Sequence, residues 1–173
     1  MRTKYVMFAI CLFFVFVFVF VFTIVGCGKK QAEAVAIDEK HDKCDICQIG
    51  VMDNQFATEV ILENGKALKF DDIGCMYKWM EINPGEKTKE KFVRDYDSKE
   101  WISLEDATYV YDKTIKTPMA YNVISFENKK DAESFVSNYK GKVLSYKELA
   151  EHKWEMNKEM MGNPKKGNHG GHH

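Results

Sequence analysis

Apolar and polar residues follow the same succession of patterns twice along this chain. Each half begins with two strand-like runs rich in β-branched and aromatic residues, continues with a helical pattern and ends in a third strand. In the first half these runs are residues 56–62, 66–70, 73–82 and 91–96. In the second half they are residues 107–112, 120–126, 129–139 and 142–146. The pattern predicts an α+β fold in which antiparallel strands are covered on one face by helices.

Residues with known turn and capping preferences mark the ends of these elements. The Asn-Gly pair at 64–65 favours a tight hairpin turn between the first two strands. Asp71 or Asp72 is expected to cap the first helix, and the sequence NPG at 83–85 is expected to end it. A last helix is predicted over residues 146–161, with only its first half packed on the core.

The N-terminal segment has the pattern of an export signal. The positive start MRTK is followed by an apolar run over residues 5–26, close to the roughly 20 residues that a membrane-spanning helix needs. The sequence IVGC at 24–27 resembles the bacterial lipobox. We therefore expect a lipoprotein signal peptide over residues 1–26 and lipid, including palmitate, on Cys27, with a retained membrane anchor as the alternative. Either arrangement would hold the chain at the cell membrane, facing the extracytoplasmic side.

Composition divides the rest of the chain into three segments. Residues 27–43 have little to bury and are expected to form a flexible linker. One compact domain is expected over residues 44–155, followed by a flexible tail over residues 156–173 that contains methionine and histidine. Three histidines of this tail are either an auxiliary metal site or the remnant of an expression tag: His169, His172 and His173.

Charge and motif content exclude two classes of function. The chain has 25 basic and 26 acidic residues, a formal net charge of −1, and no basic patch, so nucleic-acid binding is not expected. Removal of the predicted signal would take away two further basic residues, Arg2 and Lys4. The sequence has no Ser-His-Asp pattern and no phosphate-binding loop. We therefore do not expect an enzyme.

Sulfur-containing residues are the candidate chemistry. Beyond the signal and Cys27, the chain has three cysteines, and this odd number excludes a fully paired set of intrachain disulfides. Cys44 and Cys47 form a Cys-x-x-Cys pair. A redox pair of this kind is expected at the start of a helix, but a strand is predicted to follow here. A structural zinc site needs four ligands, and the sequence has no second pair of this type. The third alternative is Cu(I), which prefers thiolate and thioether ligands together.

The remaining sulfur residues differ in how well their positions suit a ligand. Met119 lies in the predicted loop KTPMAY, where a large apolar residue needs a reason, and Met52 follows the Cys-x-x-Cys pair closely. Both are candidate thioether ligands. Cys75 falls on the apolar, inward-facing side of the first predicted helix, so we expect it to be buried and to serve packing.

Several of these motifs together resemble the NosL family of lipoprotein copper chaperones. The resemblance covers residue 44 to about residue 149, together with the lipoprotein signal. The matching motifs are CDIC at 44–47, FDD at 70–72, Trp101, TPM at 117–119 and DAESF…GKVLSY at 131–146. One departure is the pair Gln48-Ile49 after the second cysteine, where the family usually has a methionine. This departure leaves the thioether to Met119 or to Met52.

The resemblance implies both a fold and a function. The implied fold consists of two ββα-type halves. The implied function is the binding of Cu(I) by Cys44, Cys47 and Met119, with delivery to the copper-sulfide centre of nitrous oxide reductase, an enzyme of denitrification. The implied partners are this reductase and its copper-site assembly machinery. A thiol-disulfide redox lipoprotein and a zinc-binding interaction module remain the alternatives.

Overall fold

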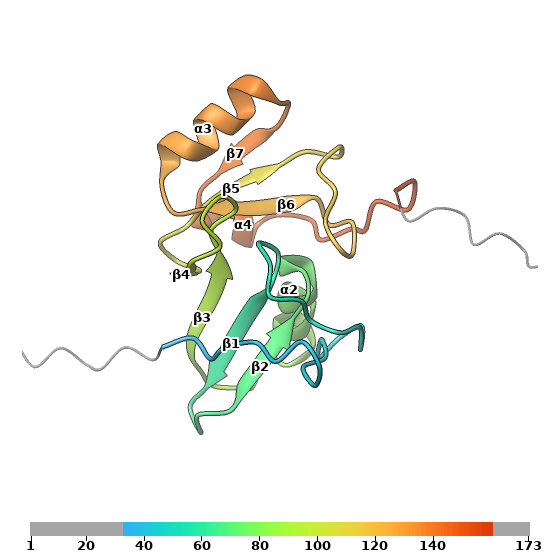
Figure 1. The fold of residues 1–173 in the computed structure, drawn as a ribbon, viewed down its shortest axis with the longest axis vertical. Helices are drawn as coiled ribbons and strands as arrows, with labels where there is room; N and C mark the ends of the chain where they lie inside the picture. The colour runs from blue at the N-terminus through green and yellow to red at the C-terminus, as the bar shows by residue number, and fades with distance from the viewer. Residues whose placement is uncertain (1–32, 161–173) are drawn as a thin grey trace, which may run out of the picture. The chain divides into compact units, whose positions relative to one another are not determined.

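A computed structural model describes residues 33–160 of the chain (Figure 1). The predicted signal peptide, Cys27 and the three tail histidines lie outside the described residues. Within the described part, the elements are β1 (Thr58–Leu62), β2 (Ala67–Phe70), α2 (Ile73–Ile82), β3 (Thr88–Arg94), β4 (Trp101–Ser103), β5 (Thr108–Tyr111), β6 (Val123–Phe126), α3 (Lys129–Asn138), β7 (Lys142–Leu144) and α4 (Tyr146–Ala150). No helix among residues 33–160 has the length and apolar character needed to span a membrane.

The strands form two antiparallel sheets, one from each half of the sequence. The first sheet has the order β2-β1-β3-β4, and the second has the order β6-β5-β7. Helix α2 packs against β1 and β2, whereas α3 packs against all three strands of the second sheet (Figure 1). The predicted α+β fold of two helix-covered halves is confirmed. The short strand β4 was not predicted.

Side-chain alternation explains how one core joins the two halves. Along β5, Tyr109 belongs to the main core together with residues of β1, β2 and α2, whereas the next residue, Val110, points to the opposite face and packs near α3. The same alternation separates Val123 from Ile124 on β6. Because successive strand residues face opposite sides, the second sheet is buried on both faces. This explains why β6 is apolar at nearly every position.

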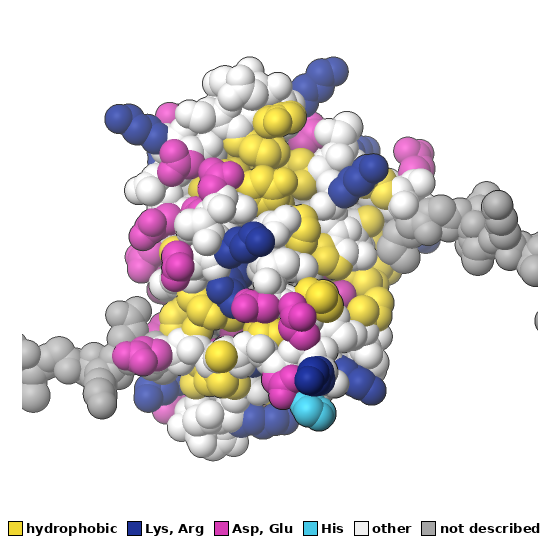
Figure 2. Space-filling model, viewed as in Figure 1, with side chains coloured by type: hydrophobic (Ala, Val, Ile, Leu, Met, Phe, Trp, Pro, Cys, Tyr) yellow, Lys and Arg dark blue, Asp and Glu magenta, His cyan; other side chains and the backbone are white. Residues whose placement is uncertain are grey.

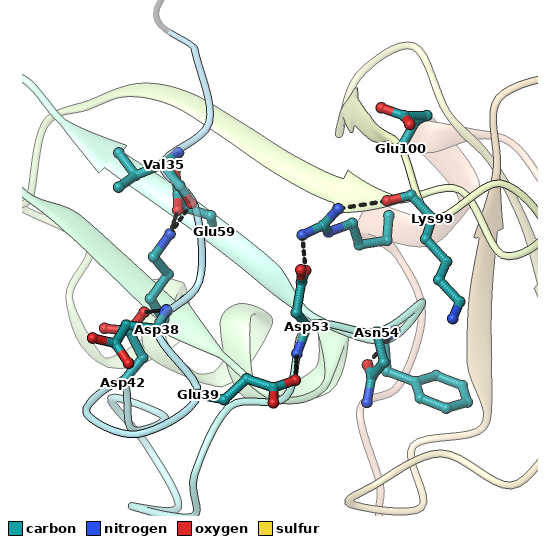
Figure 3. Close-up of polar contacts among 12 residues, drawn as sticks. Val35, Asp38, Glu39, Asp42, Asp53, Asn54, Glu59, Lys99 and Glu100 are labelled. Atoms are coloured by element: carbon teal, nitrogen blue, oxygen red, sulfur yellow. Dashed lines mark hydrogen bonds and ion pairs between the residues drawn. The ribbon is translucent and has the colours of Figure 1, made fainter.

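A buried ion pair covers the other face of the first sheet. Glu59 on β1 lies directly opposite Lys69 on β2, and their side chains form a salt bridge that is almost fully shielded from water (Figure 3). The backbone of Val35 completes this contact, since its N–H donates to Glu59 at 2.8 Å and its carbonyl accepts from the Lys69 ammonium. A buried pair needs such additional partners to offset its desolvation.

The segment before Cys44 is therefore part of the folded unit from about Val35 onward. Residues 27–43 were expected to be a flexible linker, but Val35 is bonded to the first sheet, and Lys43 forms a β-bridge with Gly50. The Val51 N–H also donates to the carbonyl of Asp42 at 3.0 Å. Glu59 and Lys69 provide hydrogen-bond partners for the backbone of Val35, and the composition of residues 27–43 gives no sign of these partners.

The predicted last helix is wrong beyond its first turn. Helix α4 ends at Ala150, and the chain continues without regular structure through the described residues that follow. Trp154 stacks on Tyr77 of α2 with ring centroids 4.3 Å apart, and the Asn157 N–H donates to the carbonyl of Ala120 at 2.8 Å. These tertiary contacts override the helical propensity of the segment.

The start of the last strand before α3 also differs from expectation. The strand was predicted from residue 120, but β6 begins at Val123 because Ala120 and Asn122 adopt positive φ angles of 54° and 63°. Asn122 is fully buried, and its side-chain amide donates to the Ile115 carbonyl at 2.6 Å. The segment is therefore a tightly bonded loop and not a strand.

Gly74 is required where this loop meets α2. A Cβ atom at this position would overlap the ring of Tyr121, which is 5% exposed. We expect Gly74→Ala to lower the free energy of unfolding by about 1–3 kcal/mol, the usual cost of overpacking. Urea unfolding followed by circular dichroism measures this change. The matched control is Gly85→Ala, where an added Cβ meets nothing within 4 Å, and an equal loss in both variants would contradict the assignment.

Candidate metal centre

Three cysteines and one aspartate converge at one end of the first sheet. The sulfur atoms of Cys44, Cys47 and Cys75 and a carboxylate oxygen of Asp71 all lie within 4.8 Å of one another. Cys44 and Cys47 come from the loop before β1, Asp71 follows β2, and Cys75 lies in the first turn of α2. All three cysteines are free thiols. The cluster thus joins segments that are 24 or more residues apart in the sequence.

The Cys-x-x-Cys pair lies on a closed loop. The Cys44 N–H donates to the Ile49 carbonyl at 2.8 Å, and the Gln48 N–H donates back to the Cys44 carbonyl at 3.0 Å. Gln48 has a φ of 64°, which reverses the chain, and its side-chain amide donates a second bond to the same Cys44 carbonyl. No helix begins directly after Cys47, because the next regular element along the described chain is β1. The loop therefore lacks the helix start that lowers the pKa of a thioredoxin-type cysteine.

A reciprocal pair of hydrogen bonds attaches this loop to β2. The Asp45 N–H donates to the Lys69 carbonyl at 3.0 Å, and the Lys69 N–H donates to the Asp45 carboxylate at 3.2 Å. Lys69 is the residue whose ammonium forms the buried ion pair with Glu59. The loop that carries two of the thiols is consequently fixed to the same strand that leads into Asp71.

Asp72 caps α2 and binds the loop that contains Met119. One carboxylate oxygen accepts from the Gly74 N–H at 3.0 Å, which is the N-cap interaction. The other accepts from the Thr117 hydroxyl at 2.7 Å and from the Met119 N–H at 2.9 Å. Burial raises the pKa of Asp72, although these three donors favour its charged form. Of the two capping candidates, Asp72 is the one that caps the helix.

The three thiols have different acidities because they share hydrogen bonds. The Cys75 thiol donates to the Cys44 sulfur, and this bond, with backbone N–H groups of Cys47, Asp71 and Ile46, lowers the pKa of Cys44 to about 7. The same bond to Cys44, together with burial, raises the pKa of Cys75 well above its usual range. Burial raises the pKa of Cys47 to about 12. The Cys47 thiol donates to both carboxylate oxygens of Asp71 at 3.4 Å.

Solvent reaches this cluster from one side. Cys44 and Cys75 are 0% and 1% exposed, whereas Cys47 is only partly buried. The loop next to Cys47 carries two apolar side chains that are about half exposed, Ile49 at 54% and Met52 at 52%. Figure 2 shows that apolar side chains also lie between acidic and basic ones on one face of the molecule. Cys44 and Cys75 therefore form the buried side of the thiol cluster, and Cys47 forms its more accessible side.

The structure places the sequence-derived candidates as follows. The sulfurs of Cys44 and Cys47 lie close together, as a shared site requires. Cys75 is buried as expected, but its sulfur also lies within 4.8 Å of the other two, which was not expected. Met119 is half-buried against the main core, and its backbone is bonded to Asp72 beside the cluster. The sequence suggested Asp71 only as a helix cap. Its place at the end of a strand and four residues before Cys75 could have indicated a metal ligand.

Comparisons with known proteins identify the family of this chain and agree with its fold. The chain matches the model of the NosL family over residues 34–154, more than half of its length, and it belongs to that family. A structure similar to it is described as the crystal structure of the copper chaperone NosL from Shewanella denitrificans. The two share 24% sequence identity with a TM-score of 0.58, over 67% of this chain and 94% of that one. A search of curated proteins finds no match.

The contact between Cys75 and Cys44 predicts an unusually acidic thiol. In the metal-free full chain, thiolate absorbance should increase near pH 7 by the amount of one thiol, because the pKa of Cys44 is lowered from 9.0 to about 7. This thiolate contributes to stability above pH 9, and the contribution is lost as the pH falls through about 7. Cys44→Ala should remove the step in absorbance. A first step only above pH 8 in the wild type would contradict the prediction.

Proposed function

We propose that this chain is a membrane-anchored chaperone that binds Cu(I) and delivers it for assembly of the copper-sulfide centre of nitrous oxide reductase. The observation that carries the proposal is the convergence of three free thiols within 4.8 Å in a protein of the NosL family. The solved structure that resembles this chain is described as a copper chaperone, which supports copper as the bound metal. The reductase and its assembly machinery are the proposed partners.

The donor set favours Cu(I) over harder ions. Thiolates and thioethers are polarisable and select soft metal ions, and in this proposal Cys44 and Cys47 provide two thiolates. Met119 supplies the thioether, since Asp72 holds its backbone beside the cluster. Met52 is the weaker candidate because its side chain is 52% exposed and no described hydrogen bond joins it to the cysteines. Copper would serve here as the cargo of the protein.

The position of Cys47 supports a role in transfer. A chaperone must give up its ion, which is easier when a partner's ligand can attack before all the donor's ligands have left. Cys47 is partly buried on the more accessible side of the cluster, beside the exposed side chains of Ile49 and Met52. A partner could therefore replace Cys47 first, while the more deeply buried Cys44 still holds the ion.

Zinc is the second candidate because the cluster contains enough ligands for it. Structural zinc sites are four-coordinate and accept thiolate and carboxylate ligands. Three cysteines and Asp71 lie within 4.8 Å of one another, so a tetrahedral zinc site is available without the tail histidines. Competition between Cu(I) and Zn(II) for the anaerobic full chain, followed by thiolate-to-metal absorption, distinguishes the two functions.

Cu(I) binding should depend on the Cys-x-x-Cys pair. The double variant Cys44→Ser/Cys47→Ser should lose high-affinity Cu(I) binding, measured by competition with a coloured chelator, because oxygen is a poor ligand for this soft ion. Its far-ultraviolet circular dichroism should remain that of the wild type. Met119→Leu, which keeps a similar volume, should weaken binding and spare the fold. Undiminished Cu(I) affinity in the double variant would exclude the proposed site.

The anchoring proposal rests on the lipobox-like sequence at 24–27. We propose that Cys27 becomes the lipidated N-terminus of a protein that faces the extracytoplasmic side of the cell membrane. Cys27→Ala should then accumulate as an unprocessed precursor of higher mass. Mass spectrometry of both proteins after detergent-phase partitioning measures the difference. Processing of the variant as in the wild type would contradict the lipobox assignment, whereas an uncleaved wild type would indicate a retained anchor.

A further inference from the structure

We propose that Cys75 is a metal ligand, so that three cysteine sulfurs, together with the thioether, surround the ion in this chain. The inference rests on the copper-binding function proposed above and deepens it, because it names a ligand that lies outside the Cys-x-x-Cys pair. Cys75 is the third residue of α2, and helical spacing alone predicts only that it is buried.

The distances between the sulfurs suit a shared ion. Metal–sulfur bonds of about 2.3 Å place three sulfurs arranged around one ion about 4 Å apart. The sulfurs of Cys44, Cys47 and Cys75 already lie within 4.8 Å of one another. Each would need to move by less than about 1 Å to reach bonding distance, within what side-chain rotation permits. The three sulfurs therefore lie close to the spacing that a shared ion requires.

Packing alone does not account for this arrangement. A cysteine used as a small core residue needs only apolar neighbours. The Cys75 sulfur instead lies within 4.8 Å of the sulfurs of Cys44 and Cys47 and of a carboxylate oxygen of Asp71. Asp71 is itself the acceptor of the Cys47 thiol at 3.4 Å. Cys75 therefore faces a group of metal-ligating atoms and not an apolar neighbourhood alone.

Cys75 lies on the buried side of the proposed metal site. Cys75 and Cys44 are 1% and 0% exposed, so an ion bound to both would be shielded on the side opposite Cys47. The N-terminal end of α2, where Cys75 lies, carries the positive end of the helix dipole and favours negative charge. On binding, the ion replaces the thiol protons, which pass to solvent through the side of Cys47. No electron transfer is involved.

The test compares Cu(I) affinity among variants of the full chain, kept reduced in detergent and titrated against a chelator. Cys75→Ala and Cys75→Ser should each weaken Cu(I) binding at least about tenfold. The matched control is Met76→Leu, which removes the neighbouring sulfur on the same helix with little change in volume and should leave the affinity within about twofold. X-ray absorption of the copper-loaded wild type should show an all-sulfur shell, and this shell should lose one sulfur in the Cys75→Ser protein.

The outcomes separate this inference from the copper function. Unchanged affinity and an unchanged sulfur shell in folded Cys75 variants would overturn it, even if the Cys44→Ser/Cys47→Ser protein no longer bound copper. If both variants failed to fold, the copper-loaded wild type would decide, because X-ray absorption should then find four sulfur ligands, and a shell of only three would overturn the inference. If the wild type bound no Cu(I), the copper function would fail, and the same variants titrated with Zn(II) would decide the role of Cys75.

Discussion

The carboxylate of Asp72 is the constraint that joins the two halves of this protein at its candidate metal centre. One of its oxygens begins α2 and so sets the position of Cys75, while the other holds the loop of Met119 through two hydrogen bonds. A buried carboxylate is costly unless donors surround it, so these contacts have to form together. A shift of the second half would take away two of the three donors of Asp72 and leave only the Gly74 N–H. One side chain therefore links the placement of Cys75 to that of Met119.

A second set of polar contacts fixes the other side of the cluster. The ion pair of Glu59 and Lys69 is completed by the backbone of Val35 (Figure 3). The backbone of Lys69 in turn holds Asp45 within the Cys-x-x-Cys loop. Removal of one member of such a buried pair typically costs about 3–5 kcal/mol. The loop with Cys44 thus depends on the same strand that carries the ion pair. Two independent networks bring the thiols together from opposite sides.

Local sequence signals predicted the elements well, but they could not predict which of them meet. The bounds of α2 agree with its apolar spacing and its cap, and the two helix-covered halves follow from repeated strand and helix patterns. The contact between Cys44 and Cys75 depends instead on hydrogen bonds between backbones far apart in sequence, which leave no periodic pattern. The positive φ angles of Ala120 and Asn122 were equally hidden, since neither residue type is glycine.

The chemistry of the cluster follows from how three similar side chains share hydrogen bonds. The bond with Cys75 lowers the pKa of Cys44, and the same bond, together with burial, raises the pKa of Cys75, whereas the pKa of Cys47 is raised mainly by burial. A soft ion bound by this cluster would replace the proton of a thiol that ionises near pH 7 and the protons of two thiols whose pKa values are raised. Each displaced proton weakens the net binding, because breaking an S–H bond opposes the new metal–sulfur bond. The raised pKa values of Cys47 and Cys75 would therefore lower the net affinity for an ion bound by all three sulfurs below that of three free thiolates.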